Sequence, residues 1–103
     1  MYTVPLTPRL VARVTPAGPV VRVRLEGRLE LAAIHPLLAL LAGDRWTAGA
    51  LDVSAVSGGG DVALATLVSE LEALWLPKVR VEGLSPNAKR LLRTMHLGQS
   101  IVA

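Results

Sequence analysis

Hydrophobic and charged positions alternate along three short stretches of this chain, and this alternation predicts β-strands. In residues 20–26 alternate aliphatic side chains, from Val21 to Leu25, point to one side and the charged ones to the other, as in a sheet with one packed and one wet face. Residues 10–15 alternate more weakly and precede a Pro-Ala-Gly-Pro turn, so we expect an edge strand in a hairpin with 20–26. Residues 78–82 repeat the alternation. The residues expected to face inward are Val21, Val23, Leu25, Val79 and Val81.

Apolar residues at helical spacing predict a helix before the middle of the chain and another near its end. Pro36 fits the first turn of the former, where a missing N–H costs little, and Gly43-Asp44 is expected to end it. Ser85 is expected to be the N-cap of the latter, with Pro86 at its first position and Gly98 as its stop. The expected apolar sides are Leu37, Leu38, Leu40 and Leu41 in the first helix, and Ala88, Leu91, Leu92 and Met95 in the second; Lys89, Arg90 and Arg93 are expected to face solvent.

The stretch 48–75 predicts a buried strand, a glycine-rich loop over 57–60 and an amphipathic helix. Asp61 suits the N-cap or first turn, because a carboxylate there accepts backbone N–H groups and complements the helix dipole. We expect this strand-to-helix loop to carry the function. The apolar residues of the stretch are Ala50, Leu51 and Val53 in the strand and Leu64, Leu67, Val68, Leu71, Leu74 and Trp75 in the helix, which Leu76-Pro77 is expected to end.

The elements follow the order β-β-α-β-α-β-α, which predicts an α/β fold. We expect a mixed sheet with helices packed mainly on one face. Residues 1–9, with two prolines, are expected to be a loosely ordered lead-in, and residues 10–103 a single domain.

Composition narrows the function. The chain has 103 residues, no cysteine and three aromatic residues, so its core must be aliphatic and it can form neither a disulfide nor a cysteine metal site. No signal sequence or membrane-spanning run is evident, which predicts a cytoplasmic protein without direct membrane insertion. The net charge of +3 includes no run of more than two consecutive Lys or Arg, so no nucleic-acid partner is expected. A basic sheet face made by Arg22, Arg24, Lys78 and Arg80 is conceivable, although a solvated face explains these residues more simply.

Catalytic and metal-binding patterns are missing. His35 and His96 have no partner at the spacing that metal or triad chemistry needs, and there is no nucleophile elbow or Walker lysine. We therefore expect no enzyme activity, no metal and no cofactor. One alternative stays open, because residues 58–63 match G-x-G-x-x-A after a strand, which suggests a small nucleotide-binding domain. Asp61 opposes it by placing negative charge where a pyrophosphate would lie.

Three blocks of the sequence resemble the STAS domain, the fold of bacterial anti-sigma factor antagonists. They are GRLEL at 27–31, LDVSAVSGGGDVALATLV at 51–68 and VRVEGLSPNAKRLLRTMHL at 79–97. The resemblance implies a regulatory protein–protein interaction domain that binds an anti-sigma factor or regulatory kinase, as a possible homodimer. The second choice that the resemblance implies is an accessory subunit bound to the ATPase of a lipid-transport ABC complex.

The resemblance also implies a phosphorylated hydroxyl at the helix start, and this chain departs from that pattern. Gly60 replaces the usual aspartate, Asp61 and Val62 replace the two hydroxyl residues, and Ala63 replaces a glycine. Either the phosphorylation switch is lost, which we favour, or Asp61 imitates the modified state. Ser57 is the nearest candidate for modification. The expected partner-binding residues are Ser57, Gly58, Gly59, Gly60, Asp61, Val62, Thr66, Ser69 and Glu70.

Overall fold

The computed structural model describes residues 1–42, 48–58, 60–73 and 78–102 as one α/β domain. Five strands form a single mixed sheet in the order β1-β2-β3-β4-β5. The first three pair antiparallel, and β3, β4 and β5 pair parallel. The strands are β1 (Tyr2–Thr7), β2 (Leu10–Ala17), β3 (Val20–Gly27), β4 (Ala48–Val56) and β5 (Lys78–Glu82); the helices are α1 (Leu31–Leu41), α2 (Gly60–Ala73) and α3 (Pro86–Thr94).

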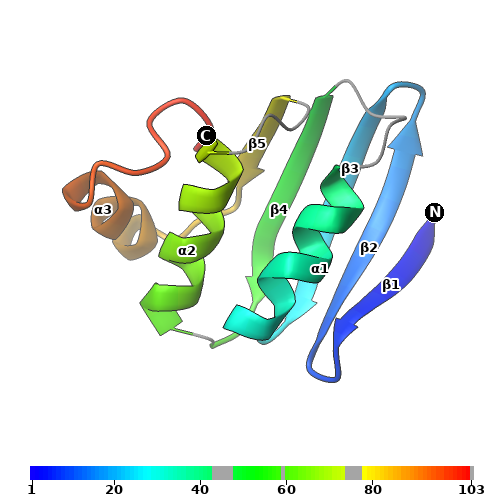
Figure 1. Ribbon diagram of the computed structural model, residues 1–103, viewed down its shortest axis with the longest axis horizontal. Coiled ribbons are helices and arrows are strands. Elements are labelled where there is room, and N and C mark those ends of the chain that lie inside the picture. The colour runs from blue at the N-terminus through cyan, green and yellow to red at the C-terminus, as the bar shows by residue number, and fades with distance from the viewer. Residues whose placement is uncertain (43–47, 59, 74–77, 103) are drawn as a thin grey trace.

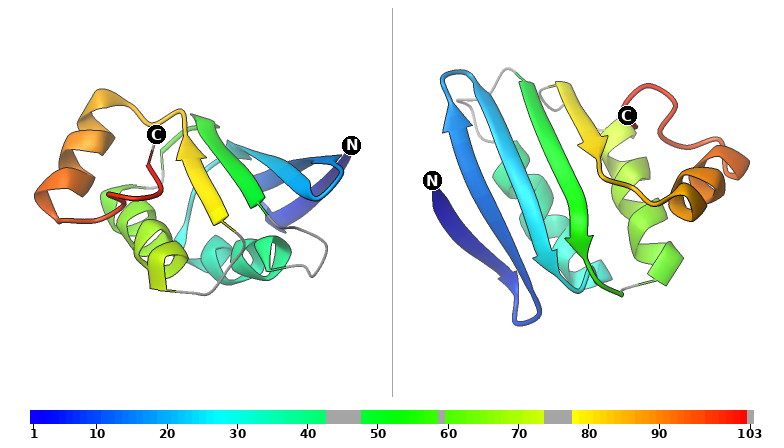
Figure 2. Two further views of the ribbon diagram at one scale, coloured as in Figure 1. Left: turned by 90° about the horizontal axis from the view of Figure 1, so that it is seen from above. Right: turned by 180° about the vertical axis from the view of Figure 1, so that it is seen from behind.

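Both α1 and α2 cover the same face of the sheet, and the opposite face is bare (Figures 1 and 2). Each joins two parallel strands, which need a crossover long enough to return the chain to the same edge. The core between the sheet and the helices is aliphatic: among the described residues, every buried hydrophobic side chain is Leu, Val, Ile or Ala. The predicted fold class, with helices on one main face, is therefore confirmed.

All five residues of β3 and β5 that were predicted to face inward are buried. Val23, Leu25 and Val81 are fully buried, and Val21 and Val79 nearly so. Residues with the opposite parity, such as Arg22 and Arg80, are exposed on the bare face. Because side chains in a strand alternate with period two, this parity fixes the register of the hydrophobic core.

The N-terminal expectation is wrong, because Tyr2–Thr7 forms β1 and not a loose lead-in. It pairs with β2, which consequently lies inside the sheet and not at its edge. Leu6 is buried against the core, while Pro5 lies in the outermost strand, where a residue without an N–H is tolerated. The prolines obscured a strand that the Val4–Leu6 alternation could have indicated.

The helix boundaries also differ in part. Helix α1 begins at Leu31, so Pro36 lies inside it and not in its first turn. In α3, Ser85 is the N-cap as predicted, and its hydroxyl accepts a 3.1 Å hydrogen bond from the Ala88 N–H. The helix ends at Thr94, before Gly98, and His96 takes the left-handed conformation with φ of 57°. The predicted positions Gly43-Asp44, Leu74, Trp75 and Leu76-Pro77 lie outside the described residues.

Candidate functional site: a groove beside helix α2

The loop between β4 and α2 is fixed by two glycines and one backbone hydrogen bond. Gly58 and Gly60 have φ of 74° and 78°, a region that other residues avoid because their Cβ would clash. The Ser57 N–H donates to the Gly27 carbonyl at 2.7 Å, which ties the loop to the end of β3. Asp61 lies in the first turn of α2, as predicted. Gly59 lies outside the described residues.

A groove of about 510 Å³ runs along the exposed side of α2. Its apolar contacts are prominent, because Val62 is 69% exposed and Met95, at the end of α3, is 48% exposed. Asp61 and Glu70 add carboxylates, and no cation is among the lining residues. The lining residues are Asp61, Val62, Ala65, Thr66, Ser69 and Glu70 of α2, with Met95 and Leu97.

Five of the predicted partner-binding residues meet in this groove: Asp61, Val62, Thr66, Ser69 and Glu70. Ser57 and Gly58, in the loop before the helix, and Gly60, the first residue of α2, do not line it. The sequence analysis missed Met95 and Leu97, and it wrongly placed Met95 in a buried stripe. Met95 is the C-cap of α3 and its N–H still bonds the Leu91 carbonyl, but at this end of the helix its side chain is exposed and not covered by the core.

Two residues with a side-chain hydroxyl, Thr66 and Ser57, lie near the start of α2. Thr66 Oγ1 donates a 2.7 Å hydrogen bond to the Val62 carbonyl, the usual back-bond of a threonine within a helix. Ser57 is exposed, and its hydroxyl lies 3.5 Å from the Gly27 carbonyl oxygen. Gly60, Asp61 and Val62 are all exposed, so the helix start presents a carboxylate and an isopropyl group where a hydroxyl was expected by resemblance.

A second hollow, of about 290 Å³, lies at the carboxyl ends of the parallel strands. Its lining includes Gly58, Gly60 and Asp61 from the start of α2, and Ser85 from the start of α3. The carboxylate of Asp61 therefore lines the place where the nucleotide hypothesis needs a phosphate, and this disfavours an anionic ligand. The glycine motif is better explained by the left-handed turns of the loop.

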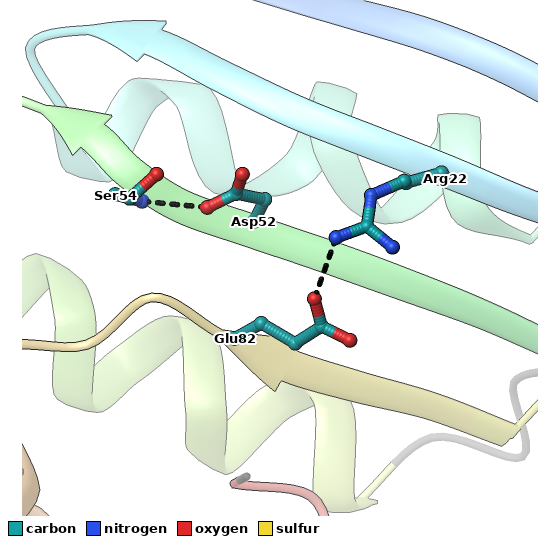
Figure 3. Close-up of polar contacts among 4 residues, drawn as sticks. All are labelled: Arg22, Asp52, Ser54 and Glu82. Carbon is teal, nitrogen blue, oxygen red and sulfur yellow. Dashed lines mark hydrogen bonds and ion pairs between the residues drawn. The ribbon is translucent and has the colours of Figure 1, made fainter.

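The bare sheet face carries charge of both signs. Glu82 on β5 accepts a 2.8 Å hydrogen bond from Arg22 on β3, across the intervening β4 (Figure 3). Glu26 lies 2.8 Å from Arg13 and 3.7 Å from Arg24. Arg13, Arg22 and Arg24 thus have acidic neighbours, although Arg80 is in none of these pairs, and the solvated-face interpretation is favoured over a basic binding face. Nothing is described of the side chain of Lys78.

Asp52 on the same face has a lowered pKa. The Ser54 hydroxyl beside this carboxylate lowers the pKa, as does the Ser54 N–H, which donates a 2.9 Å hydrogen bond to it (Figure 3). Arg24 and Arg22 favour the charged form further. Asp52 lies within β4 and not at its end, and its carboxylate accepts from the backbone two residues further on, where the register between β3 and β4 shifts.

The structure offers no sign of a metal or catalytic cluster in its described part. No three His, Asp or Glu side chains there gather closely enough to hold a metal ion. His35 and His96 are both exposed. None of the described helices is long and apolar enough to cross a membrane.

Comparison with known proteins was informative at the level of three-dimensional structure only. No protein-family model matches the chain, and no curated protein matches it. An anti-sigma factor antagonist from Mycobacterium paratuberculosis superposes with a TM-score of 0.68 at 21% identity, covering 98% of this chain and 89% of the other. The Bacillus cell fate determinant SpoIIAA, in its phosphorylated form, superposes with a TM-score of 0.58 at 19% identity, covering 89% and 90%. This chain therefore has a STAS-like fold, shared along nearly its whole length with anti-sigma factor antagonists.

Proposed function

We propose that this protein is a non-enzymatic, cytoplasmic regulatory domain that binds a protein partner through the α2 groove. The observation that supports it most is that five predicted docking residues, including the exposed Val62, line one groove together with the exposed Met95. The groove lies on a STAS-like fold. Isolated apolar residues on a surface need no explanation, but two that flank one hollow mark an interaction site.

The residues that line the groove also support a proposal for which side chains the partner presents. Asp61 and Glu70 border the apolar contacts, so the partner presents an aliphatic or aromatic side chain flanked by Lys or Arg. In an antagonist-like function this partner is an anti-sigma factor or an ATP-binding regulatory kinase. The absence of a hydroxyl at positions 60–62 supports binding that is not switched by phosphorylation there.

A capture experiment with paired variants tests the proposal. Tagged wild type, Val62→Glu and Val20→Glu are used to retain proteins from a bacterial lysate, which are identified by mass spectrometry. Val20 is 42% exposed in β3, away from the groove, so its variant controls for a new surface charge. The proposal expects a regulatory kinase or anti-sigma factor with wild type and Val20→Glu, and its loss with Val62→Glu.

Two other outcomes would redirect or refute it. Recovery of a transporter ATPase would assign the chain to the accessory-subunit alternative. Equal retention by Val62→Glu and wild type would contradict the groove as the docking site. An added Asp61→Ser variant, incubated with a recovered kinase and ATP, tests the lost switch: phosphorylation of this variant but not of wild type is expected.

A further inference from the structure

Helix α3 carries a cationic surface without neutralising partners. Lys89, Arg90 and Arg93 are all exposed, and the sequence has no Asp or Glu from Gly83 to Val102. Within the described residues none of the three forms an ion pair, in contrast to Arg13, Arg22 and Arg24 on the sheet face. The positive charges of α3 are therefore free to interact with an acidic group of another molecule.

Beside this charge lies a hollow of about 320 Å³, between α3 and the segment that follows it. Lys89 and Arg93 stand at its rim. Leu92, which is 1% exposed, and the half-buried Leu97 and Val102 supply aliphatic surface. We call this the α3 groove; Gly98 and Gln99 complete its lining.

The wall of the α3 groove is held in place by hydrogen bonds. The Val81 N–H donates to the Ile101 carbonyl at 2.7 Å, which fastens the final segment to β5. The Val102 N–H donates to the Gly98 carbonyl at 2.9 Å, and the Gly98 N–H donates to the Glu72 carboxylate. Glu72 therefore places a carboxylate beside the groove. That carboxylate is occupied by its hydrogen bond with the Gly98 N–H. A preformed wall lowers the ordering cost of binding.

We propose that the α3 groove binds an acidic peptide segment of another protein, with an aliphatic side chain against Leu97 and Val102 and carboxylates beside Lys89 and Arg93. Charge complementarity supports a negatively charged occupant. The concave aliphatic surface favours a peptide over a membrane, because membrane-bound basic helices turn their apolar face outward and Leu92 is buried. Single-stranded nucleic acid is disfavoured, since residues 83–102 contain no Phe, Tyr or Trp on which a base could stack, and His96 does not line the groove. This surface adjoins the α2 groove, because Leu97 lines both, but the cationic residues Lys89 and Arg93 line the α3 groove alone.

The test begins with selection of binders from a random 12-residue peptide library on the immobilised protein. We expect enrichment of peptides in which Leu, Ile or Met is flanked by Asp or Glu. Affinity of the best fluorescein-labelled peptide is then measured by anisotropy, with circular dichroism to verify that every variant is folded. A selection without acidic enrichment overturns the proposal.

Two variants on the same helix separate groove binding from general electrostatic attraction. Arg93→Glu reverses a charge at the groove, and Arg90→Glu makes the same change on α3 outside the lining. Arg93→Glu is expected to weaken the peptide by about tenfold, because an attraction becomes a repulsion of similar size, and Arg90→Glu by less than about threefold. Equal effects of the two variants contradict a defined groove.

Other occupants give distinct results. Sedimentation with phosphatidylglycerol-containing vesicles that depends on Arg93, without acidic peptides in the selection, would replace the peptide by a membrane. Self-association in analytical ultracentrifugation that is abolished by Arg93→Glu would replace it by a second copy of this chain. Either result overturns the proposal.

Discussion

Gly27, at the end of β3, connects the sheet to the loop before α2 through the hydrogen bond from the Ser57 N–H to its carbonyl. Substitution of Gly27 therefore tests the backbone geometry of this region. Its φ is 119°, which residues with a side chain rarely adopt. A Cβ at this position would overlap the Arg9 carbonyl oxygen and lie 3.2 Å from the Cα of Leu10. Neighbouring hydrogen bonds use the same backbone: the Arg28 N–H donates to the Arg9 carbonyl at 2.8 Å, and the Ser57 N–H to the Gly27 carbonyl at 2.7 Å.

The expected cost of Gly27→Ala is the sum of strain and displaced hydrogen bonds. An unfavourable φ costs about 1–3 kcal/mol, and two weakened hydrogen bonds about 1 kcal/mol each, so the free energy of unfolding should fall by about 3–5 kcal/mol. For a domain of this size the melting temperature should fall by roughly 15–30 °C. Because the Ser57 bond is involved, the loop before α2 should also lose hydrogen-exchange protection.

Gly18→Ala is the matched control. Gly18 also has a positive φ, of 64°, but a Cβ there meets no atom within 4 Å. It should cost only the left-handed strain, about 1 kcal/mol. Urea denaturation of both variants measures the difference. If Gly27→Ala is no more destabilising than Gly18→Ala, the close approach of the Arg9 carbonyl is refuted.

Two further predictions concern the core and the sheet face. Leu51→Ala removes a side chain with no solvent exposure and should cost about 2–5 kcal/mol in urea denaturation, whereas Leu31→Ala, at a site 56% exposed, should change stability by less than about 1 kcal/mol. Asp52→Asn should destabilise the protein at neutral pH, because the lowered pKa of Asp52 means that its charged form favours the folded state. That contribution is present above about pH 4 and is lost as the pH falls through the folded-state pKa, so wild type and variant should converge in acid. A stability difference that persists unchanged below pH 3 would contradict this origin.

The sequence by itself determined which residues face the core. Strict period-two alternation in β3 and β5 leaves one arrangement that buries the valines, and the Ser85-Pro86 pair marks a helix start through local hydrogen bonding alone. The strand, loop and helix of residues 48–73 were predictable for the same reason. These features depend on neighbours within a few positions along the chain.

Only the tertiary structure decided which segments distant in the sequence lie next to one another. β1 becomes a strand because β2 offers an edge, which outweighs the local effect of Pro5. Met95 and Leu97 join Asp61 and Val62 because α3 ends early and the chain turns at His96, a left-handed position that no local pattern signalled. Likewise Arg22 and Glu82, 60 residues apart, meet only because β3 and β5 flank β4. Contacts between distant segments follow from the packing of whole elements, and local periodicity carries no information about them.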